Sequence, residues 1–298
     1  MSADVRRQED TRHPCFYAAS RKRYGRIHLP VAASCNIQCV YCRRDHDCPH
    51  ENRPGVSRGV LSPVAAMDYL DRVLKVMPEI SVVGIAGPGD PFSAPTATLE
   101  TLTRVRAAHP DMAMCVSTNG LDLLPHIDAL EALGVGFVTV TANAVHPAIA
   151  ARLSPSILFE GRRLHGAAAG ETLVARQLAA VAQLKARGFT VKVNCVVLPG
   201  VNEHHVPSVA ERMAQLGVDI MNVLPLLPVA GTAMADTPPP SPGLMKKIRE
   251  QAARHVPQMQ HCTRCRADAA GLLGSAVSET PQPEPPQRSC GGDGLGCA

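Results

Sequence analysis

The chain contains no tryptophan, and only 3% of its 298 residues are aromatic. Proteins that bind single-stranded nucleic acid use aromatic side chains as platforms on which bases stack, so this composition disfavours that class of function. The formal net charge of +4 at pH 7 is also too small to indicate binding to a polyanion. We therefore expect no nucleic-acid partner.

Long apolar segments are missing too. No run approaches the roughly 18 apolar residues that a membrane-spanning helix requires. The amino-terminal segment MSADVRRQED is charged and lacks the apolar stretch of a secretory signal. The sequence therefore predicts a cytoplasmic protein with no membrane partner.

Cysteine, in contrast, is abundant, with 11 residues in the chain. Their number is odd and no export signal accompanies them, which disfavours a framework of disulfide bonds. Metal ligation or redox chemistry is the better interpretation of so many thiols in a cytoplasmic protein.

The middle of the chain alternates strand-like and helix-like segments. Strands that alternate with helices form a parallel sheet with right-handed crossovers. About six strand–helix units can be counted, fewer than the eight of a closed barrel. The expected fold class is therefore α/β, as a partial (βα)₆ TIM-like barrel. The expected strands are 27–31, 82–86, 112–117, 137–141, 190–197 and 218–223. The expected helices begin at Ser62-Pro63 and lie near 97–108, 122–133, 171–187, 205–216 and 243–256.

Four parts follow from this pattern. Residues 1–26 form an amino-terminal extension and residues 27–235 form the barrel. Residues 236–274 form a carboxy-terminal extension that begins at a proline-rich break. The tail 275–298 is rich in proline and glycine, and we expect it to be disordered.

Three cysteines, Cys35, Cys39 and Cys42, have the spacing C-x₃-C-x₂-C in the loop after the first expected strand. This pattern resembles the radical S-adenosylmethionine (SAM) family. Three thiolates can hold a [4Fe-4S] cluster and leave one iron open for the amino and carboxylate groups of SAM. A zinc site is the alternative, but structural zinc usually takes four ligands in paired spacings. Tyr41 could pack beside the adenine of SAM or simply pack in the protein.

Polar and glycine-rich turns follow three of the expected strands. The carboxyl ends of parallel strands are where α/β proteins bind ligands, so these turns are candidates for contact with SAM. Glycine lets the backbone approach a small ligand closely, although glycine and asparagine also form ordinary turns. The candidate residues are Gly87, Gly89, Asp90, Ser117, Asn119 and Asn143.

Several further cysteines exceed what a single cluster needs. Cys262 and Cys265 form a C-x₂-C pair, which is a good half-site for a metal or cluster. Cys48 lies in the same expected loop as the triplet. Cys115 lies near the end of a strand and could either face the reaction chamber or be a buried structural thiol. Cys15 precedes the barrel, in a segment that could be disordered.

With these motifs the chain resembles the NifB family of nitrogenase cofactor maturases, over roughly residues 13–274. The combination is far more specific than the triplet alone. The matching segments are His28–Ala32, Asp47–Cys48, Glu51–Val56, Gly84–Pro91, Ser117–Leu121, Thr141–Val145, Lys192–Asn194, Leu198–Asn202 and Cys262–Ala269.

The resemblance implies a specific reaction. NifB-like enzymes fuse two further [4Fe-4S] clusters, with an added sulfur and a carbide, into an eight-iron precursor of the nitrogenase FeMo-cofactor. One SAM donates a methyl group, and a second yields the radical that abstracts hydrogen from it. The enzyme class implied is therefore a radical SAM enzyme of the lyase or transferase type.

The resemblance also implies which residues hold the clusters. The first additional cluster matches Cys15, Cys115 and His28, with His13 as the competing nitrogen ligand. The second matches Cys48, Cys262 and Cys265. Glu51 and Arg53 could position SAM, take part in proton transfer or form a salt bridge, and Asn194 joins the SAM-binding candidates. Cys195, Cys290 and Cys297 lie outside the family ligand set.

Partners are implied in the same way: iron–sulfur cluster donors and an electron donor such as ferredoxin or flavodoxin. Many bacterial members carry a NifX-like carboxy-terminal domain that is not found in this sequence. We therefore expect the product to need a separate carrier or direct transfer to an assembly scaffold. Two other functions stay open. One is a multi-cluster radical SAM maturase acting on a peptide or small molecule, and the other is a non-enzymatic iron–sulfur carrier.

Overall fold

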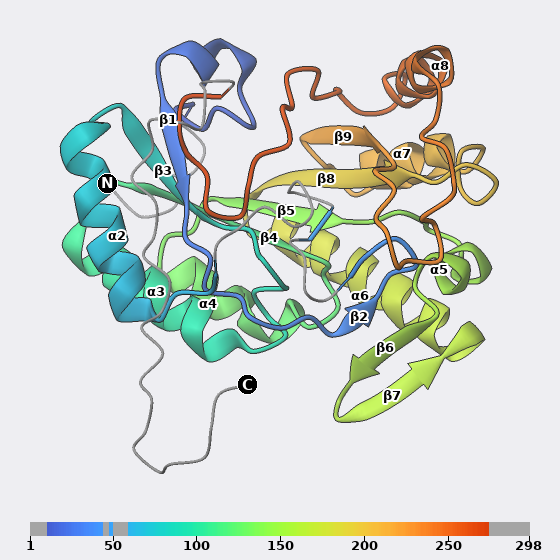
Figure 1. Ribbon diagram of the computed structural model, residues 1–298, viewed down its shortest axis with the longest axis horizontal. Coiled ribbons are helices and arrows are strands. Elements are labelled where there is room, and N and C mark those ends of the chain that lie inside the picture. Colours follow the sequence, from blue (N-terminus) through green and yellow to red (C-terminus); the bar gives the residue numbers. More distant parts are fainter. Residues whose placement is uncertain (1–10, 44–47, 50–58, 274–298) are drawn as a thin grey trace, which may run out of the picture.

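The computed structural model describes residues 11–43, 48–49 and 59–273, and its main element is a curled, seven-stranded sheet (Figure 1). Six strands run parallel, and a short seventh strand pairs antiparallel with the first strand at the edge. The expected partial (βα)₆ barrel is therefore confirmed. In spatial order the strands are β10 (Ala270–Gly271), β1 (Gly25–His28), β3 (Ile80–Ile85), β4 (Ala113–Thr118), β5 (Phe137–Thr141), β8 (Thr190–Val197) and β9 (Ile220–Pro225).

Helices cover the outer side of this sheet (Figure 1). The α-helices are α2 (Pro63–Val76), α3 (Pro95–Ala108), α4 (Ile127–Ala132), α5 (Pro147–Leu153), α6 (Gly166–Ala186), α7 (Val206–Gln215) and α8 (Pro242–Ala252). Two 3₁₀ helices, η1 (Ala18–Lys22) and η2 (Leu124–His126), complete the set in the described residues. Among these helices, none combines the length and apolar character that crossing a bilayer demands.

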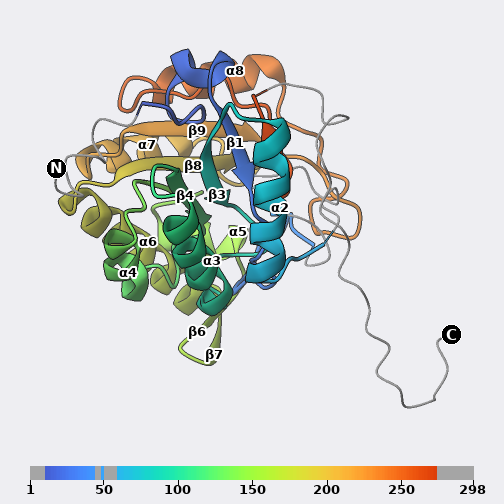
Figure 2. The same ribbon diagram turned by 90° about the vertical axis from the view of Figure 1, so that its left-hand side faces the viewer.

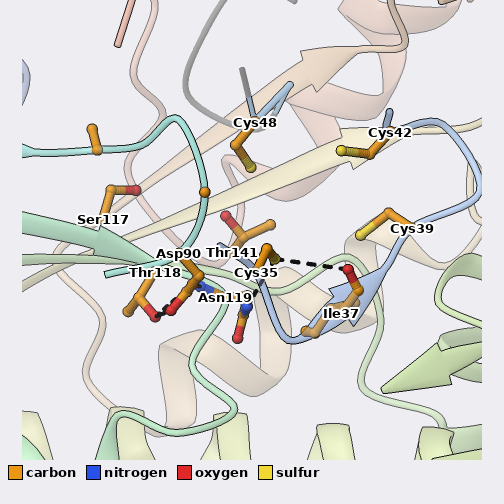
Figure 3. Close-up of a pocket in the computed structure, with 12 residues that line it drawn as sticks. Cys35, Ile37, Cys39, Cys42, Cys48, Asp90, Ser117, Thr118, Asn119 and Thr141 are labelled. Atoms are coloured by element: carbon orange, nitrogen blue, oxygen red, sulfur yellow. Dashed lines mark hydrogen bonds between the residues drawn. The ribbon is translucent and has the colours of Figure 1, made fainter. Parts of the chain in front are cut away.

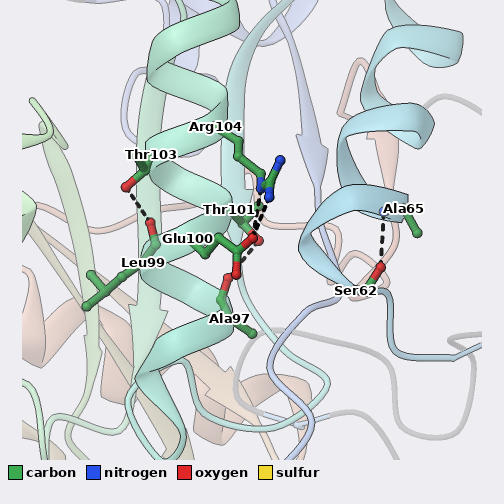
Figure 4. Close-up of polar contacts among 8 residues, drawn as sticks. All are labelled: Ser62, Ala65, Ala97, Leu99, Glu100, Thr101, Thr103 and Arg104. Carbon is green, nitrogen blue, oxygen red and sulfur yellow. Dashed lines mark hydrogen bonds and ion pairs between the residues drawn. The ribbon is translucent and has the colours of Figure 1, made fainter.

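The start of α2 agrees with the sequence (Figure 4). The Ser62 hydroxyl accepts a hydrogen bond from the Ala65 amide at 3.2 Å, and Pro63 occupies the first turn. In the neighbouring helix α3, Arg104 pairs with Glu100 at 2.7 Å, one helical turn away. Helix α2 is therefore stabilised by its cap, and α3 by an ion pair between residues that are close in sequence.

The two faces of the parallel sheet differ in chemistry. Residues of one parity, such as Val83 and Val138, pack with the helices in the main hydrophobic core. Residues of the other parity face the inside of the curl and are largely polar. Those that are buried or partly buried on this inner face include Arg26, His28, Cys115, Ser117, Thr139, Thr141, Lys192, Asn194 and Asn222. The inner face of the parallel sheet is therefore a largely buried surface that consists mainly of polar side chains.

A second, small sheet lies at one side of the molecule. Strands β6 (Ser156–Phe159) and β7 (Arg162–His165) form a hairpin, and β6 pairs with β2 (Ile37–Gln38) inside the cysteine loop. Both views show the hairpin projecting beyond the helices, on the opposite side from α8 (Figure 2). Glu160 and Gly161 have φ of 49° and 72°, as a tight two-residue hairpin turn needs. Helix α6 begins directly after this hairpin, earlier than the sequence predicted.

The segments before β1 and after α8 lie side by side (Figure 1). β10 pairs with β1, and His261 Nε2 lies 2.8 Å from the carbonyl oxygen of Pro14. The two cysteine-bearing extensions are therefore held together at the β1 edge of the sheet. The predicted disordered tail, 275–298, lies outside the described residues.

Candidate functional site

The cysteine triplet lies beside the carboxyl ends of the central strands (Figure 3). Cys39 is buried, and Cys35 and Cys42 are partly exposed. All three line one pocket, together with Cys48 and residues that end β3, β4 and β5. The other lining residues are Ile37, Ala86, Gly89, Asp90, Ser117, Thr118, Asn119 and Thr141. The structure thus brings together the triplet and most of the strand-end residues singled out in the sequence.

A zinc ion bound by the cysteine triplet is the alternative that the sequence left open. Structural zinc needs its ligands within about 2.3 Å of one ion. Within the part of the chain that the structure describes, no three His, Cys, Asp or Glu side chains are close enough to share an ion.

Gly89 holds the cysteine loop against the sheet. Its amide donates to the Ala32 carbonyl at 2.7 Å, and the next amide, of Asp90, donates to the Ser34 carbonyl at 2.7 Å. A Cβ on Gly89 would lie 2.1 Å from the Ser34 oxygen, so only glycine fits. The carbonyl of Gly87 accepts from the Ala32 amide, and Gly87 itself is not among the pocket-lining residues. This glycine-rich turn positions the triplet.

Asp90 joins two turns rather than standing free. Its carboxylate accepts hydrogen bonds from the Phe92 amide at 2.9 Å, the Asn119 amide at 2.6 Å and the Thr118 hydroxyl at 2.9 Å. Burial raises the pKa of Asp90 to about 6, although these hydrogen bonds lower it in part. The sequence predicted that Asp90 contacts SAM; Asp90 lines the pocket of the triplet, and its oxygens also tie the turn after β3 to the turn after β4.

Asn119 connects the turn after β4 to the cysteine loop. Its Nδ2 donates to Asn36 Oδ1 at 2.7 Å and lies 3.7 Å from the Cys35 sulfur. Its backbone carbonyl accepts from Gln177 Nε2 at 2.8 Å, and the same nitrogen donates to the Thr141 carbonyl. Gln177 lies on α6 and was missed in the sequence, where an apolar helix pattern gave no reason to single it out.

Asn143 fixes Tyr41. Its Nδ2 lies 2.6 Å from the Tyr41 hydroxyl, and its Oδ1 accepts from the Val196 amide at 2.8 Å. Tyr41 is fully buried, and burial raises its pKa well above the ordinary value. Asn143 also lines a second pocket, which shares Ile37, Cys39, Asn119 and Thr141 with the first. The second pocket adds Ala144, Ala150, Leu153, Ser154, Leu173 and Gln177, none of which was a predicted site residue.

His28 and Cys115 meet on the inner face, above the strand between them. Strands β1, β3 and β4 place His28, Gly84 and Cys115 in one register. A Cβ on Gly84 would lie 2.8 Å from Cys115 Sγ and 3.1 Å from His28 Cδ2. The absence of a side chain at Gly84 therefore leaves room for the thiol and the imidazole to approach each other.

The hydrogen bonds of the two candidate histidines fix different tautomers. His28 Nδ1 lies 3.1 Å from the Arg266 carbonyl and must donate to it, which leaves a lone pair on Nε2. Burial lowers the pKa of His28 to about 4, so the ring is neutral. In His13, Nδ1 accepts from the Cys15 amide at 3.2 Å, so the proton of the neutral ring is on Nε2. Of the two histidines, only His28 therefore has an Nε2 lone pair that can bind a metal.

The remaining cysteines approach this region from the two extensions. Burial raises the pKa of Cys15 to about 12, and the charges of Cys265 and Cys262 act on the same thiol. The sulfur of Cys265 accepts a hydrogen bond from Arg26 Nη2 at 2.9 Å. Cys262 packs against the apolar cluster that includes Tyr41 and the triplet. Cys15, Cys262 and Cys265 therefore lie on the same side of the sheet.

Some predicted residues lie elsewhere. Cys195 is fully buried on the outer face of β8, in the main hydrophobic core, and burial raises its pKa to about 12. Asn194 is buried on the inner face but does not line either pocket. Glu51, Arg53, Cys290 and Cys297 lie outside the described residues.

Comparison with known proteins places this geometry in a family. Residues 29–213 match the model of the radical SAM superfamily. The chain is 50% identical, over 267 residues, to the FeMo cofactor biosynthesis protein NifB of Chlorobaculum tepidum, covering 90% of this chain and 63% of that protein. It is 42% identical over 271 residues to the protein of the same name from Klebsiella pneumoniae, covering 90% of this chain and 58% of that one. The chain thus spans less than two thirds of the length of these relatives.

Solved structures share the fold. Streptococcus suis SuiB bound to S-adenosylmethionine matches with a TM-score of 0.56 at 13% identity, over 78% of this chain and 50% of that one. Methylornithine synthase (PylB) matches with a TM-score of 0.53 at 15% identity, over 94% and 82%. The family model covers more than half of the chain, so this protein belongs to the radical SAM superfamily, and its sequence relatives described above are NifB proteins.

Proposed function

We propose that this protein assembles an iron–sulfur precursor of the nitrogenase FeMo-cofactor, with two [4Fe-4S] clusters as its substrates. The meeting of His28 and Cys115 over Gly84, beside the SAM-type triplet, carries this proposal. A radical SAM enzyme needs no histidine at this place. A neutral imidazole with its Nε2 lone pair free, next to a thiol, is what a weakly held cluster requires.

The triplet fits the SAM cluster. Cys35, Cys39 and Cys42 line one pocket with the ends of three strands. When bound there, a [4Fe-4S] cluster supplies an electron for the reductive cleavage of SAM. The protein contributes a rigid frame, because Gly89 and Asn119 both bond to the cysteine loop. Ser117 and Thr141 line the same pocket and are the polar groups we assign to SAM.

The substrate clusters would take the remaining ligands. We assign Cys15, His28 and Cys115 to the first, and Cys48, Cys262 and Cys265 to the second. Few protein ligands per cluster leave irons free to rearrange, which fusion into a larger cluster demands. The added carbon would come from SAM, and the product would also contain one extra sulfur. Glu51 and Arg53 are kept as residues that position SAM or move a proton.

Partners follow from the same chemistry. The substrate clusters must come from iron–sulfur donor proteins, and the electron from a carrier such as ferredoxin or flavodoxin. The product would pass to a separate carrier or to the cofactor assembly scaffold.

Iron content and SAM cleavage test the proposal together. Anaerobic reconstitution is expected to give about twelve irons per chain, as three cubane clusters require. Cys42→Ala is expected to abolish SAM cleavage while leaving the clusters of the other two sets. The clusters should also change their absorption and EPR signals on turnover with SAM, because they are consumed. About four irons in the fully reconstituted protein, or auxiliary clusters that survive turnover unchanged, would contradict it.

A further inference from the structure

Arg26 is a buried cation on the inner face of the sheet. It lies on β1 two residues before His28, so both side chains face inward while Ile27 between them packs in the core. Only 5% of its surface is exposed. A buried guanidinium is costly unless its charge and its N–H groups find partners, so the partners of Arg26 indicate its role.

Those partners include sulfur. Arg26 Nη2 donates to Cys265 Sγ at 2.9 Å, and Nη1 donates to the carbonyls of Gly271 and Leu272. A sulfur that we assign to the second cluster site, Cys265 Sγ, is therefore a direct hydrogen-bond partner of this buried cation.

One donor atom of Arg26, Nε, makes no hydrogen bond to the described residues. Its Nε–H is buried and has no hydrogen-bond partner among the described residues. A buried N–H without an acceptor is rare in proteins and destabilises the fold. An acceptor supplied by a bound group would remove that cost, and the nearby sulfurs suggest the chemistry of such a group.

Lys192 is a second buried basic residue whose charge acts on the same group of cysteines as Arg26. Lys192 on β8 is 4% exposed, and its charge acts on Cys15 together with that of Arg26. Thiolate-bound iron–sulfur clusters are anions, and two of them in one chamber repel each other strongly because the surroundings are of low dielectric constant. Two buried cations next to Cys15 would reduce that repulsion.

We propose that Arg26 is a positioning residue for the substrate clusters, which donates N–H···S hydrogen bonds to thiolate and cluster sulfur and offsets their charge. The inference rests on the proposed function, because it needs clusters at Cys15 and Cys265. Its forked guanidinium can orient a cluster that has only three protein ligands without occupying an iron. Hydrogen bonds to sulfur and nearby positive charge raise the reduction potential of a cluster, and this gives a readout other than activity.

The test uses the full chain carrying Cys35→Ala, Cys39→Ala and Cys42→Ala, so that the signals come from the substrate clusters alone. After anaerobic reconstitution, iron content and EPR-monitored redox titration are compared with and without Arg26→Gln. We expect a lower reduction potential and altered EPR g-values at similar iron content, and a smaller shift for Arg26→Lys. Arg106→Gln is the matched control, because Arg106 binds the carbonyls of Leu133 and Gly134 at the end of α4.

A second measurement needs no change at position 26. In protein labelled with ¹⁵N-arginine, pulsed EPR of the reduced clusters is expected to show a weak ¹⁵N coupling from a guanidinium near the cluster. Its absence would overturn the inference, even if Arg26→Gln failed to fold. An unchanged potential and EPR spectrum in Arg26→Gln would overturn it as well. A triple-alanine protein that takes up no iron at all would instead overturn the proposed function, on which the inference depends.

Discussion

His28 on β1 and Cys115 on β4 lie together over Gly84, the residue of β3 that separates them in the sheet. Three neighbouring parallel strands thus put an imidazole, a hydrogen atom and a thiol in one row. The row faces the polar inner side of the curl, where the cysteines of both extensions also lie. The geometry of a site for a large inorganic group is therefore set by strand register, and it can be disturbed at Gly84 without changing any ligand.

Gly84→Ala is expected to weaken the first substrate-cluster site selectively. The new methyl would sit 2.8 Å from Cys115 Sγ, so the thiol and the imidazole must move apart. We expect a loss of up to about four of about twelve irons, with a fall of about 1–3 kcal/mol in the free energy of unfolding from overpacking. Iron analysis and urea unfolding measure the two effects.

The control for that change is Gly243→Ala, on α8. A Cβ there meets nothing within 4 Å and the residue is helical, so a small gain in stability and unchanged iron content are expected. Full iron content in Gly84→Ala would argue against a cluster bound by His28 and Cys115.

The two histidines should respond differently to replacement. His28 presents an Nε2 lone pair because its Nδ1 donates to Arg266, whereas His13 carries its proton on Nε2. His28→Ala is expected to lose the nitrogen coupling to the first substrate cluster in pulsed EPR, together with part of its iron. His13→Ala is expected to keep the coupling. The reverse result would make His13 the ligand.

Much of this arrangement was predictable from the sequence, and the rest depends on contacts between distant residues. The repeated strand–helix pattern predicted the barrel, and the C-x₃-C-x₂-C loop predicted the triplet. The choice between His28 and His13 was open, because it depends on a carbonyl 238 residues away from His28. Strand β10 is only two residues long, too short to leave a periodic pattern. The β6–β7 hairpin was missed because its strands are short and lack a clear alternation of polar and apolar residues.

Asp90 is expected to make stability fall as pH rises between about 4 and 6. Its ordinary pKa is 3.8 and burial raises the folded-state value to about 6, so the folded protein binds the proton more tightly than the unfolded chain. Ionisation above pH 6 therefore costs the fold up to about 3 kcal/mol relative to pH below 4. Urea unfolding of cluster-free protein at several pH values, compared with Asp90→Asn, isolates this contribution.

Asp90→Asn tests the direction in which the contribution of Asp90 to stability changes with pH. Asp90→Asn keeps only one side-chain oxygen for the Phe92 and Asn119 amides and turns an NH2 group toward the other amide, so it should be less stable at every pH. Its deficit relative to the native protein should shrink as pH rises from about 4 to about 6. A deficit that grows over this range would mean that the carboxylate is stabilised as the anion, with a lowered pKa.

Cys195 should be the least reactive thiol of the described cysteines, and this can be tested in the cluster-free protein. It is fully buried against the helices, and burial raises its pKa to about 12, so at pH 8 about one thiol in ten thousand is ionised. Cys262 and Cys265 are partly exposed and should react with iodoacetamide in the folded protein. Peptide mass spectrometry should find Cys195 unmodified until denaturant is added. Cys195→Val keeps the apolar volume of the site, so it is expected to leave iron content and SAM cleavage unchanged, and a loss of either would give this thiol a role in the chemistry.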